Sequence, residues 1–335
     1  MATAMPVFSR IGIEPSNPVG SVYAGHWEDG RMPDLDPLRR RGIAAVWLAT
    51  FVWAWGPVLV KWSDLPGPTF AMLRLWAGVA ISFTAIVATR RRFSWAAFRA
   101  CAAGGVLFAA DIGLGFTAVK LTTVADVALI GTLATVVIVL LSSLRLGERV
   151  TLRSWSLVGA SFVGIVIVVV ASAGLPSWSF AGDVMAFLGV GTWTTYWFFS
   201  RHVRERFDPI IYFACVMLAG ALTMTPVALV TNGVPSGIAL GDVLAVVTVA
   251  LLPGFVGHTL VIWSHKHVAS WLSALITQVS PVITVVLAWV LLGESLTRGA
   301  ILGGAIVVGA TMAVIALDAR SARADRLDEA AEKIS

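Results

Sequence analysis

The sequence predicts an all-α integral membrane protein in which ten transmembrane helices form two inverted five-helix repeats. Three observations support this fold class. Of the 335 residues, 58% are hydrophobic and only 13% are charged, whereas a soluble domain carries about 25% charged residues. The apolar residues form ten long runs with basic residues at their ends. A stretch of the first half of the chain also recurs in the second half.

The ten runs are each long enough to cross a bilayer, which requires about 20 mainly apolar residues. Turn-forming or charged residues separate them, as in the proline-rich stretch 64–68 and the three arginines at 90–92. The connections are short and leave no room for a separate soluble domain. The expected helices cover residues 43–62, 68–89, 100–119, 124–144, 154–173, 183–200, 209–231, 243–263, 269–291 and 299–317.

These helices divide the chain into a first repeat, residues 43–173, and a second repeat, residues 180–317. Residues 1–42 are polar and are expected to form a disordered cytoplasmic tail. They contain no apolar core of a signal peptide, so no cleaved targeting segment is expected. Residues 318–335 form a cytoplasmic C-terminal tail. Translation can start at Met1 or at Met32.

Basic residues indicate the orientation, because cytoplasmic loops of membrane proteins carry an excess of lysine and arginine. With a cytoplasmic N-terminus, the outer side receives only Lys61, Lys120 and Arg298. The sequence therefore predicts a multi-pass protein of the inner (plasma) membrane with both termini cytoplasmic. The cytoplasmic helix ends then carry Arg39, Arg40, Arg41, Arg90, Arg91, Arg92, Arg99, Arg145, Arg149, Arg153, Arg201, Arg204, Arg206, Lys266, Arg320, Arg323 and Arg326.

An internal repeat links the two halves. Residues 128–148 and 274–294 align without gaps and share 9 of 21 positions, including an Ala-Leu-Ile start and a Leu-Gly-Glu end. The fourth and fifth helices therefore correspond to the ninth and tenth. Because each repeat has an odd number of helices, the second copy is inverted in the membrane. Many secondary transporters have this architecture, with a binding site between the halves near the midplane.

With these features, the chain resembles the EamA-type members of the drug/metabolite transporter superfamily. The resemblance covers residues 43–317 and rests on an ordered set of residues. It implies a ten-helix carrier that exports small metabolites. One departure is Cys215, which stands where an arginine like Arg74 would align. The set comprises Leu146-Gly147-Glu148, Leu292-Gly293-Glu294, Trp55-Gly56, Arg74, Ser280-Pro281, and Phe116, Ala118 and Lys120.

Three ionisable residues lie inside predicted helices. A charge at the bilayer centre costs about 2.5–3.5 kcal/mol on insertion scales, so such residues are functional candidates. Asp111 would bind a substrate ammonium or carry a proton; the alternative is a structural hydrogen bond. His258 suits proton coupling or is a neutral histidine bonded to a carbonyl. Arg74 would hold a substrate carboxylate, snorkel to the outer interface or pair with Asp111.

The repeat offset places His258 one residue from the counterpart of Asp111, so we expect both to face one cavity. Trp55 and Trp193 occupy comparable places in the two repeats. They would wall this cavity and stack on a ligand or its cation, or pack against lipid. Gln278 lies mid-helix and is a further substrate-binding candidate.

Helix-breaking residues are candidates for gating. Proline leaves a helical carbonyl unpaired, which is tolerated where protein or a water-filled cavity satisfies it. Pro253, Gly254 and Pro281 are therefore expected at pore-lining or hinge positions, with a packing kink as the alternative. Glu148 and Glu294 end equivalent helices and suggest a structural or gating role. Gly299 and Gly303 form a GxxxG pair for helix packing, which could include a homodimer face.

Several function classes are excluded or disfavoured. The chain has no Walker, HExxH, GxSxG or dinucleotide motif, and Cys101 and Cys215 lack metal-ligand spacing. We therefore expect no catalytic residues, no cofactor and no metal. The net charge of +5 is dispersed over helix ends, which argues against a nucleic-acid partner. The expected partners are a small-molecule substrate, the lipid bilayer, protons as a coupling ion and a second copy of the chain.

The sequence thus predicts a secondary active transporter that works by alternating access. The resemblance suggests export of small metabolites such as amino acids, with Asp111 and His258 coupling transport to protons. Multidrug efflux of lipophilic cations and passive facilitation by the same fold are the alternatives. A membrane enzyme is disfavoured, because ionisable residues inside the helices are too sparse for a catalytic constellation.

Overall fold

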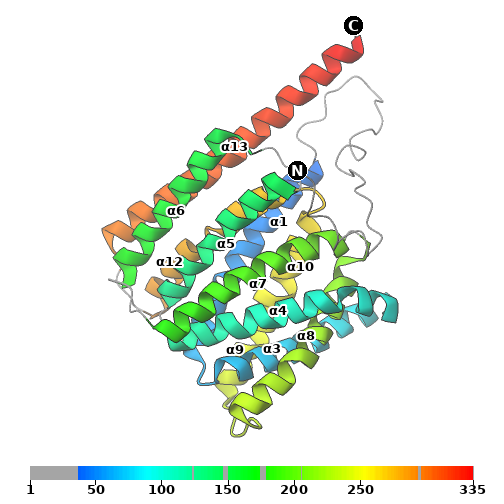
Figure 1. The fold of residues 1–335 in the computed structure, drawn as a ribbon, viewed down its shortest axis with the longest axis vertical. Coiled ribbons are helices and arrows are strands. Elements are labelled where there is room, and N and C mark those ends of the chain that lie inside the picture. The colour runs from blue at the N-terminus through cyan, green and yellow to red at the C-terminus, as the bar shows by residue number, and fades with distance from the viewer. Residues whose placement is uncertain are drawn as a thin grey trace, which may run out of the picture. The chain divides into compact units, whose positions relative to one another are not determined.

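The computed structural model describes residues 37–122, 124–145, 150–173, 179–204, 206–292 and 296–334. Within these ranges every regular element is helical (Figure 1). Seven helices are continuous over their length: α3 (Gly67–Ala88), α4 (Trp95–Leu121), α5 (Val124–Arg145), α6 (Leu152–Ala173), α7 (Phe180–Arg204), α8 (Pro209–Asn232) and α13 (Arg298–Ile334).

Three further crossings are interrupted. The first consists of α1 (Pro37–Trp53) and α2 (Trp55–Trp62). The eighth consists of α9 (Leu240–Val249), the π-helical segment η2 (Ala250–Gly257) and α10 (His258–Ser264). The ninth consists of α11 (Ser270–Thr277) and α12 (Ser280–Leu292). Together with the continuous helices they make the ten predicted crossings, arranged as two five-helix repeats.

Nine of these crossings are long and apolar enough to span a membrane, judged on the described residues. The tenth, α7, is 25 residues long. Its sequence mixes apolar residues with glycine, threonine and tryptophan, and it packs between α4 and α5 of the first repeat. Its exposed positions include Phe180, Val184, Phe187 and Leu188, so α7 also presents apolar residues on the surface of the bundle.

Several helix limits differ from the sequence-based expectation. The first helix starts at residue 37 instead of 43, and α4 starts at 95 instead of 100. The last helix continues to Ile334, through the segment 318–335 that was expected to be a tail. The expectation counted apolar residues, but backbone hydrogen bonding continues into polar residues at helix ends. Residues 1–36, which make up most of the predicted N-terminal tail, lie outside the described residues.

Prolines explain the three interruptions. A proline inside a helix removes one hydrogen bond, and its ring clashes with the carbonyl four residues earlier. Pro57 follows the break at Ala54, Pro253 lies within η2, and Pro281 follows the break at Gln278 and Val279. In contrast, α4 and α5 contain no proline and are continuous.

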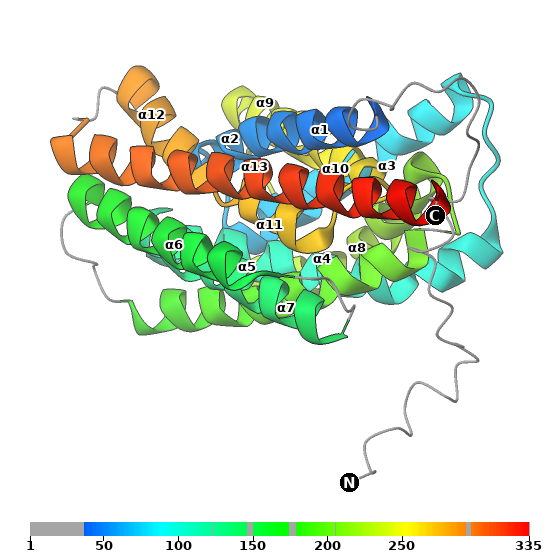
Figure 2. The ribbon, with the colours of Figure 1, turned by 90° about the horizontal axis from the view of Figure 1, so that it is seen from above.

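Helices α6 and α13, the last of each repeat, lie side by side in both views (Figures 1 and 2). Glycines allow this approach. A Cβ atom added at Gly303 would lie 2.5 Å from the carbonyl oxygen of Gly164, and one at Gly299 would lie 2.6 Å from Cβ of Ala171. The predicted GxxxG pair therefore packs within the chain. A homodimer stays a prediction and would need another surface.

Candidate substrate site

Arg74 is the buried cation at the centre of the candidate site. It lies on the continuous helix α3 and is 3% exposed. Its guanidinium carbon lies 5.2 Å from the ring centroid of Phe108 on α4, which is a cation–π contact. Its Nε and Nη1 atoms have no hydrogen-bond partner within the described structure. Buried donors are nearly always paired in proteins, so these two nitrogens need an explanation.

A glycine in the π-helical segment makes room for this guanidinium. A Cβ atom added at Gly254 would lie 3.4 Å from Nη2 of Arg74 and 3.0 Å from the carbonyl oxygen of Val249. Segments of this kind occur frequently at functional sites. The second repeat thus contacts the arginine through backbone and not through a charged side chain.

Asp111 supplies the opposite charge. It lies one helical turn after Phe108 on α4 and is partly buried. Its charge interacts with that of Arg74. No ion pair within 4.0 Å joins the two side chains, and within the described residues Asp111 has no hydrogen-bond partner. The site therefore holds the guanidinium of Arg74 and an acidic side chain that interact electrostatically but are not bonded to each other.

His258 begins α10 and lies among aromatic rings. Its ring centroid is 4.8 Å from that of Phe108 and 4.9 Å from that of Trp53. The Trp193 ring lies 6.0 Å away, and the Phe213 ring stacks at 6.3 Å. Phe108 thus contacts both Arg74 and His258. The surroundings of His258 are aromatic, as expected for a site that stacks on planar or cationic groups.

A small cavity adjoins His258. It is lined by one face of α7 and one face of α10, with residues spaced at one-turn intervals on each helix. Its volume available to the centre of a water-sized sphere is about 10 Å³, which is room for about one water molecule. In this conformation the cavity is therefore too small for a metabolite. The lining residues are Trp53, Trp193, Tyr196, Trp197, Ser200, His258, Val261, Ile262 and His265.

The structure brings part of the predicted site together. Trp193 and His258 line the cavity, as the sequence indicates, but Trp53 lines it where Trp55 was expected. Asp111 is not among the residues that line it and lies one turn after Phe108 on α4. The cavity that His258 lines therefore does not include Asp111 in this conformation, and a shared role of the two residues stays a prediction.

Gln278 lies at the break between α11 and α12. It is 3% exposed, and both side-chain amide atoms lack a partner within the described structure. Pro253 and Gly254 lie in η2, and Pro281 lies in the first turn of α12. Glu148 and Glu294 lie outside the described residues. The gating roles proposed for these positions stay predictions.

Sequence reasoning missed three residues of the site. Trp53 donates a hydrogen bond from Nε1 to the carbonyl oxygen of Pro253 at 2.9 Å, which satisfies a backbone group of the irregular segment. Phe108 is the ring shared by Arg74 and His258. Pro57 marks the break of the first helix. Of these, only Pro57 could have been found from the sequence, because a proline inside the expected helix 43–62 predicts a break in that helix.

Thr284 joins two of the interrupted helices. Its Oγ1 lies 3.0 Å from two carbonyl oxygens, that of Ala54 at the break between α1 and α2 and that of Ser280 in its own helix, and its one proton is shared between them. With the bond from Trp53 to Pro253, the three interruptions form one connected layer. Irregular backbone at membrane depth occurs where protein or a cavity satisfies it, and transporters place binding sites at such discontinuous helices.

The profile of the EamA-like transporter family matches the chain twice, over residues 40–170 and over residues 180–316. The protein belongs to this family. Each match covers five of the ten crossings, so this EamA protein has the duplicated architecture that its sequence repeat predicts. Family membership supports a role as a membrane transporter and argues against an enzyme.

The fold is shared with solved structures. One crystal structure aligns with a TM-score of 0.68 and 20% sequence identity, and the alignment covers 83% of this chain and 98% of the other. At this identity the likeness shows a common fold alone. No curated protein matches the chain.

Proposed function

We propose that this EamA protein is a secondary active carrier that exports small carboxylate-bearing metabolites, such as amino acids, by alternating access. The observation that carries this proposal is the buried guanidinium of Arg74 with two unpaired nitrogens. Leaving a buried polar group unpaired costs about 1–3 kcal/mol, and more for a charged group. A substrate carboxylate would pair with these donors in the fork geometry that arginine prefers.

Asp111 supports an amino acid over a simple carboxylate. An unbonded carboxylate close to the guanidinium offers a site for a substrate ammonium. A zwitterion would then neutralise both buried charges at once. Substrate entry requires the cavity beside His258 to widen, which suits a carrier whose repeats rock against each other.

Export from the cytoplasm across the inner membrane, and coupling of this export to protons, are parts of the same proposal. Asp111 and His258 are the candidate proton carriers, because both are ionisable groups inside the helical bundle. If the asparagine variant of Asp111 and the alanine variant of His258 both retain gradient-driven transport, neither residue couples protons.

Proteoliposomes with an imposed pH gradient test the carrier. We expect one compound from a pool of amino acids to accumulate against its gradient, and Arg74→Gln to abolish this accumulation. Arg298→Gln is the matched control, since Arg298 is exposed at the start of α13. Equilibration without accumulation would identify a passive facilitator.

Efflux of lipophilic cations is the second candidate. The aromatic walls of the cavity, with Trp53, Trp193 and Trp197, favour it because indole rings attract cations. The buried positive charge of Arg74 opposes it. Cationic drugs are therefore included in the same assay, and their accumulation in place of amino acids would replace the first candidate with the second.

A further inference from the structure

A polar cluster closes the end of the bundle where α2, α4 and α9 meet. Within the first repeat, Nζ of Lys61 donates to the carbonyl oxygens of Val119 at 2.9 Å and Thr122 at 3.0 Å. In return, Nζ of Lys120 donates to the carbonyl oxygen of Ser63. These reciprocal bonds fix the loop after α2 to the last turn of α4, so the two segments form one unit.

Asp242 ties the second repeat to this unit. It lies in the first turn of α9 and is 7% exposed. Its Oδ1 accepts hydrogen bonds from Oγ of Ser63 at 2.6 Å and from the backbone N–H of Asp64 at 3.0 Å. The positive charge of Lys120 also attracts this carboxylate. Hydrogen bonds to an ionised acceptor are about twice as strong as neutral ones.

Close packing surrounds the Asp242 contact. A Cβ atom added at Gly241 would lie 2.9 Å from Cη2 of Trp62, and one added at Gly182 would lie 2.9 Å from Cβ of Thr122. The first turns of α9 and α7 therefore press directly against the first repeat. These contacts hold the two repeats against each other at this end of the bundle.

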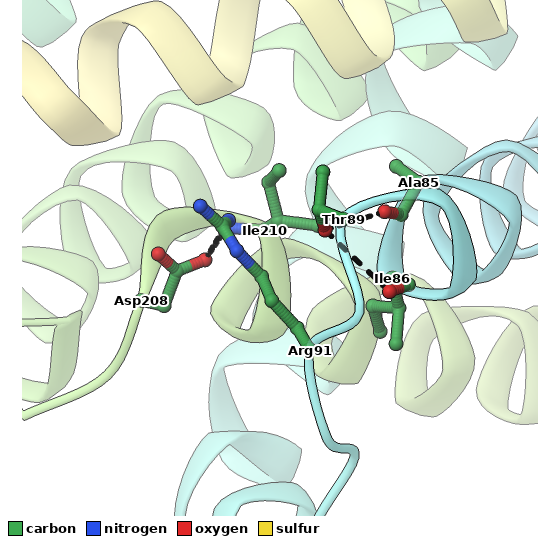
Figure 3. Close-up of polar contacts among 6 residues, drawn as sticks. All are labelled: Ala85, Ile86, Thr89, Arg91, Asp208 and Ile210. Carbon is green, nitrogen blue, oxygen red and sulfur yellow. Dashed lines mark hydrogen bonds and ion pairs between the residues drawn. The ribbon is translucent and has the colours of Figure 1, made fainter.

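The cavity beside His258 extends away from this cluster. It runs along α10 from His258 to His265, and His265 also contacts the ring of Trp197 at 4.5 Å. It thus points to the opposite end of the bundle, where Arg91 pairs with Asp208 at the start of α8 (Figure 3). A substrate bound at the centre could leave through the α2–α9 end only if the Asp242 contact opened.

We propose that Ser63 and Asp242 form a latch between the repeats that holds the α2–α9 end shut and must open once in each transport cycle. This inference rests on the proposed carrier function. Opening breaks two hydrogen bonds to a buried carboxylate, and water that enters the opened end can replace them. Lys61 and Lys120 hold the loop that carries Ser63 against α4. Ser63 therefore stays in position to bond Asp242 again when the end closes.

Crosslinking tests the latch directly. Ser63→Cys and Asp242→Cys are combined in a background with Cys101→Ala and Cys215→Ala, since both native cysteines are free and buried. Oxidation with copper phenanthroline and oxygen should link the pair and lower transport at least tenfold, and a reducing agent should restore it. Each single cysteine variant is a control and should be insensitive to oxidant. Full transport by the crosslinked protein would overturn the latch.

Amide hydrogen exchange gives a readout that needs no substrate. Asp242→Ala should accelerate exchange at least tenfold in residues 62–65 and in the first turn of α9. Asp64→Ala is the matched control: it removes a neighbouring exposed carboxylate, but the backbone N–H of Asp64 keeps its acceptor. Asp242→Asn keeps an acceptor oxygen and should exchange more slowly than the alanine variant.

The two readouts separate the latch from the carrier. Unchanged exchange in Asp242→Ala would contradict the latch even if transport were altered. Faster exchange in a protein that moves no compound would support the latch and contradict the carrier function proposed above.

Discussion

The third and fourth helices of the two repeats differ although they occupy equivalent places. In the first repeat α4 and α5 are continuous, whereas in the second repeat the counterparts of α4 and α5 are interrupted by η2 and by the turn at Gln278. Proline accounts for the difference, since only the second-repeat helices contain Pro253 and Pro281. The two repeats thus differ in whether their third and fourth helices are continuous.

The two repeats also contribute different residues to the candidate site. The first repeat contributes Arg74 and Asp111, while Cys215 stands at the aligned position of α8 and is fully buried. The second repeat contributes Gly254, His258 and most of the cavity wall. Continuous helices of the first repeat hold the charged groups in fixed positions. We expect the interrupted helices of the second repeat to change conformation around a substrate.

The largest expected effect comes from removing the charge of the first repeat. Arg74→Gln should weaken substrate binding about 10-fold to 100-fold, since a hydrogen bond to a charged group contributes about 1.5–3 kcal/mol. Isothermal titration of the purified protein with its transported compound measures this. Arg298→Gln should bind normally, and equal loss in both variants would mean that the effect is not specific to the central site.

The last helices, by contrast, are continuous in both repeats and pack against each other, and the second prediction tests that contact. Gly303→Ala should lower the free energy of unfolding by about 1–3 kcal/mol, because the added methyl group meets backbone of α6 that cannot move aside. Reversible unfolding in mixed micelles measures it. Gly309→Ala, where no atom lies within 4 Å of the added Cβ, should be neutral or stabilising.

The connection between interruptions gives a smaller effect. Trp53→Phe keeps an aromatic ring but removes the donor to the carbonyl oxygen of Pro253. We expect a loss of about 1 kcal/mol in unfolding free energy and faster amide exchange in η2. Trp55→Phe is the matched control two residues away. If both variants lose the same stability, the indole donor has no role in holding η2.

The smallest effect is expected for Thr284→Val. This change removes the bond to the carbonyl oxygen of Ala54, and hydrogen bonds between membrane helices contribute about 0.6 kcal/mol. Thr195→Val is the control, since Thr195 donates to the carbonyl oxygen of Gly191 in its own helix. A difference between the two variants in unfolding free energy would show that the layer of interruptions is bonded across helices. No difference would contradict this.

Much of the fold was predictable because it depends on local composition. The ten crossings, their order and the duplication follow from apolar runs and from the aligned stretches of the two halves. Helix limits were less predictable, since hydrogen bonding continues past the apolar core into residues such as those before Gly42. The break at Ala54 had a signal in Pro57, but a proline alone does not say whether a helix kinks, as continuous α8 with Pro226 shows.

The sequence by itself determined that this protein crosses the membrane in two repeats and that Arg74, Asp111 and His258 are ionisable groups inside it. Tertiary structure alone decided how these groups meet: Phe108 contacts both Arg74 and His258, Trp53 lines the cavity beside His258, and Asp242 contacts Ser63. The physical reason is the distance along the chain over which the deciding interactions act. Crossing a membrane requires only neighbouring apolar residues, whereas a site depends on the rotation of each helix, which is set by packing against distant ones.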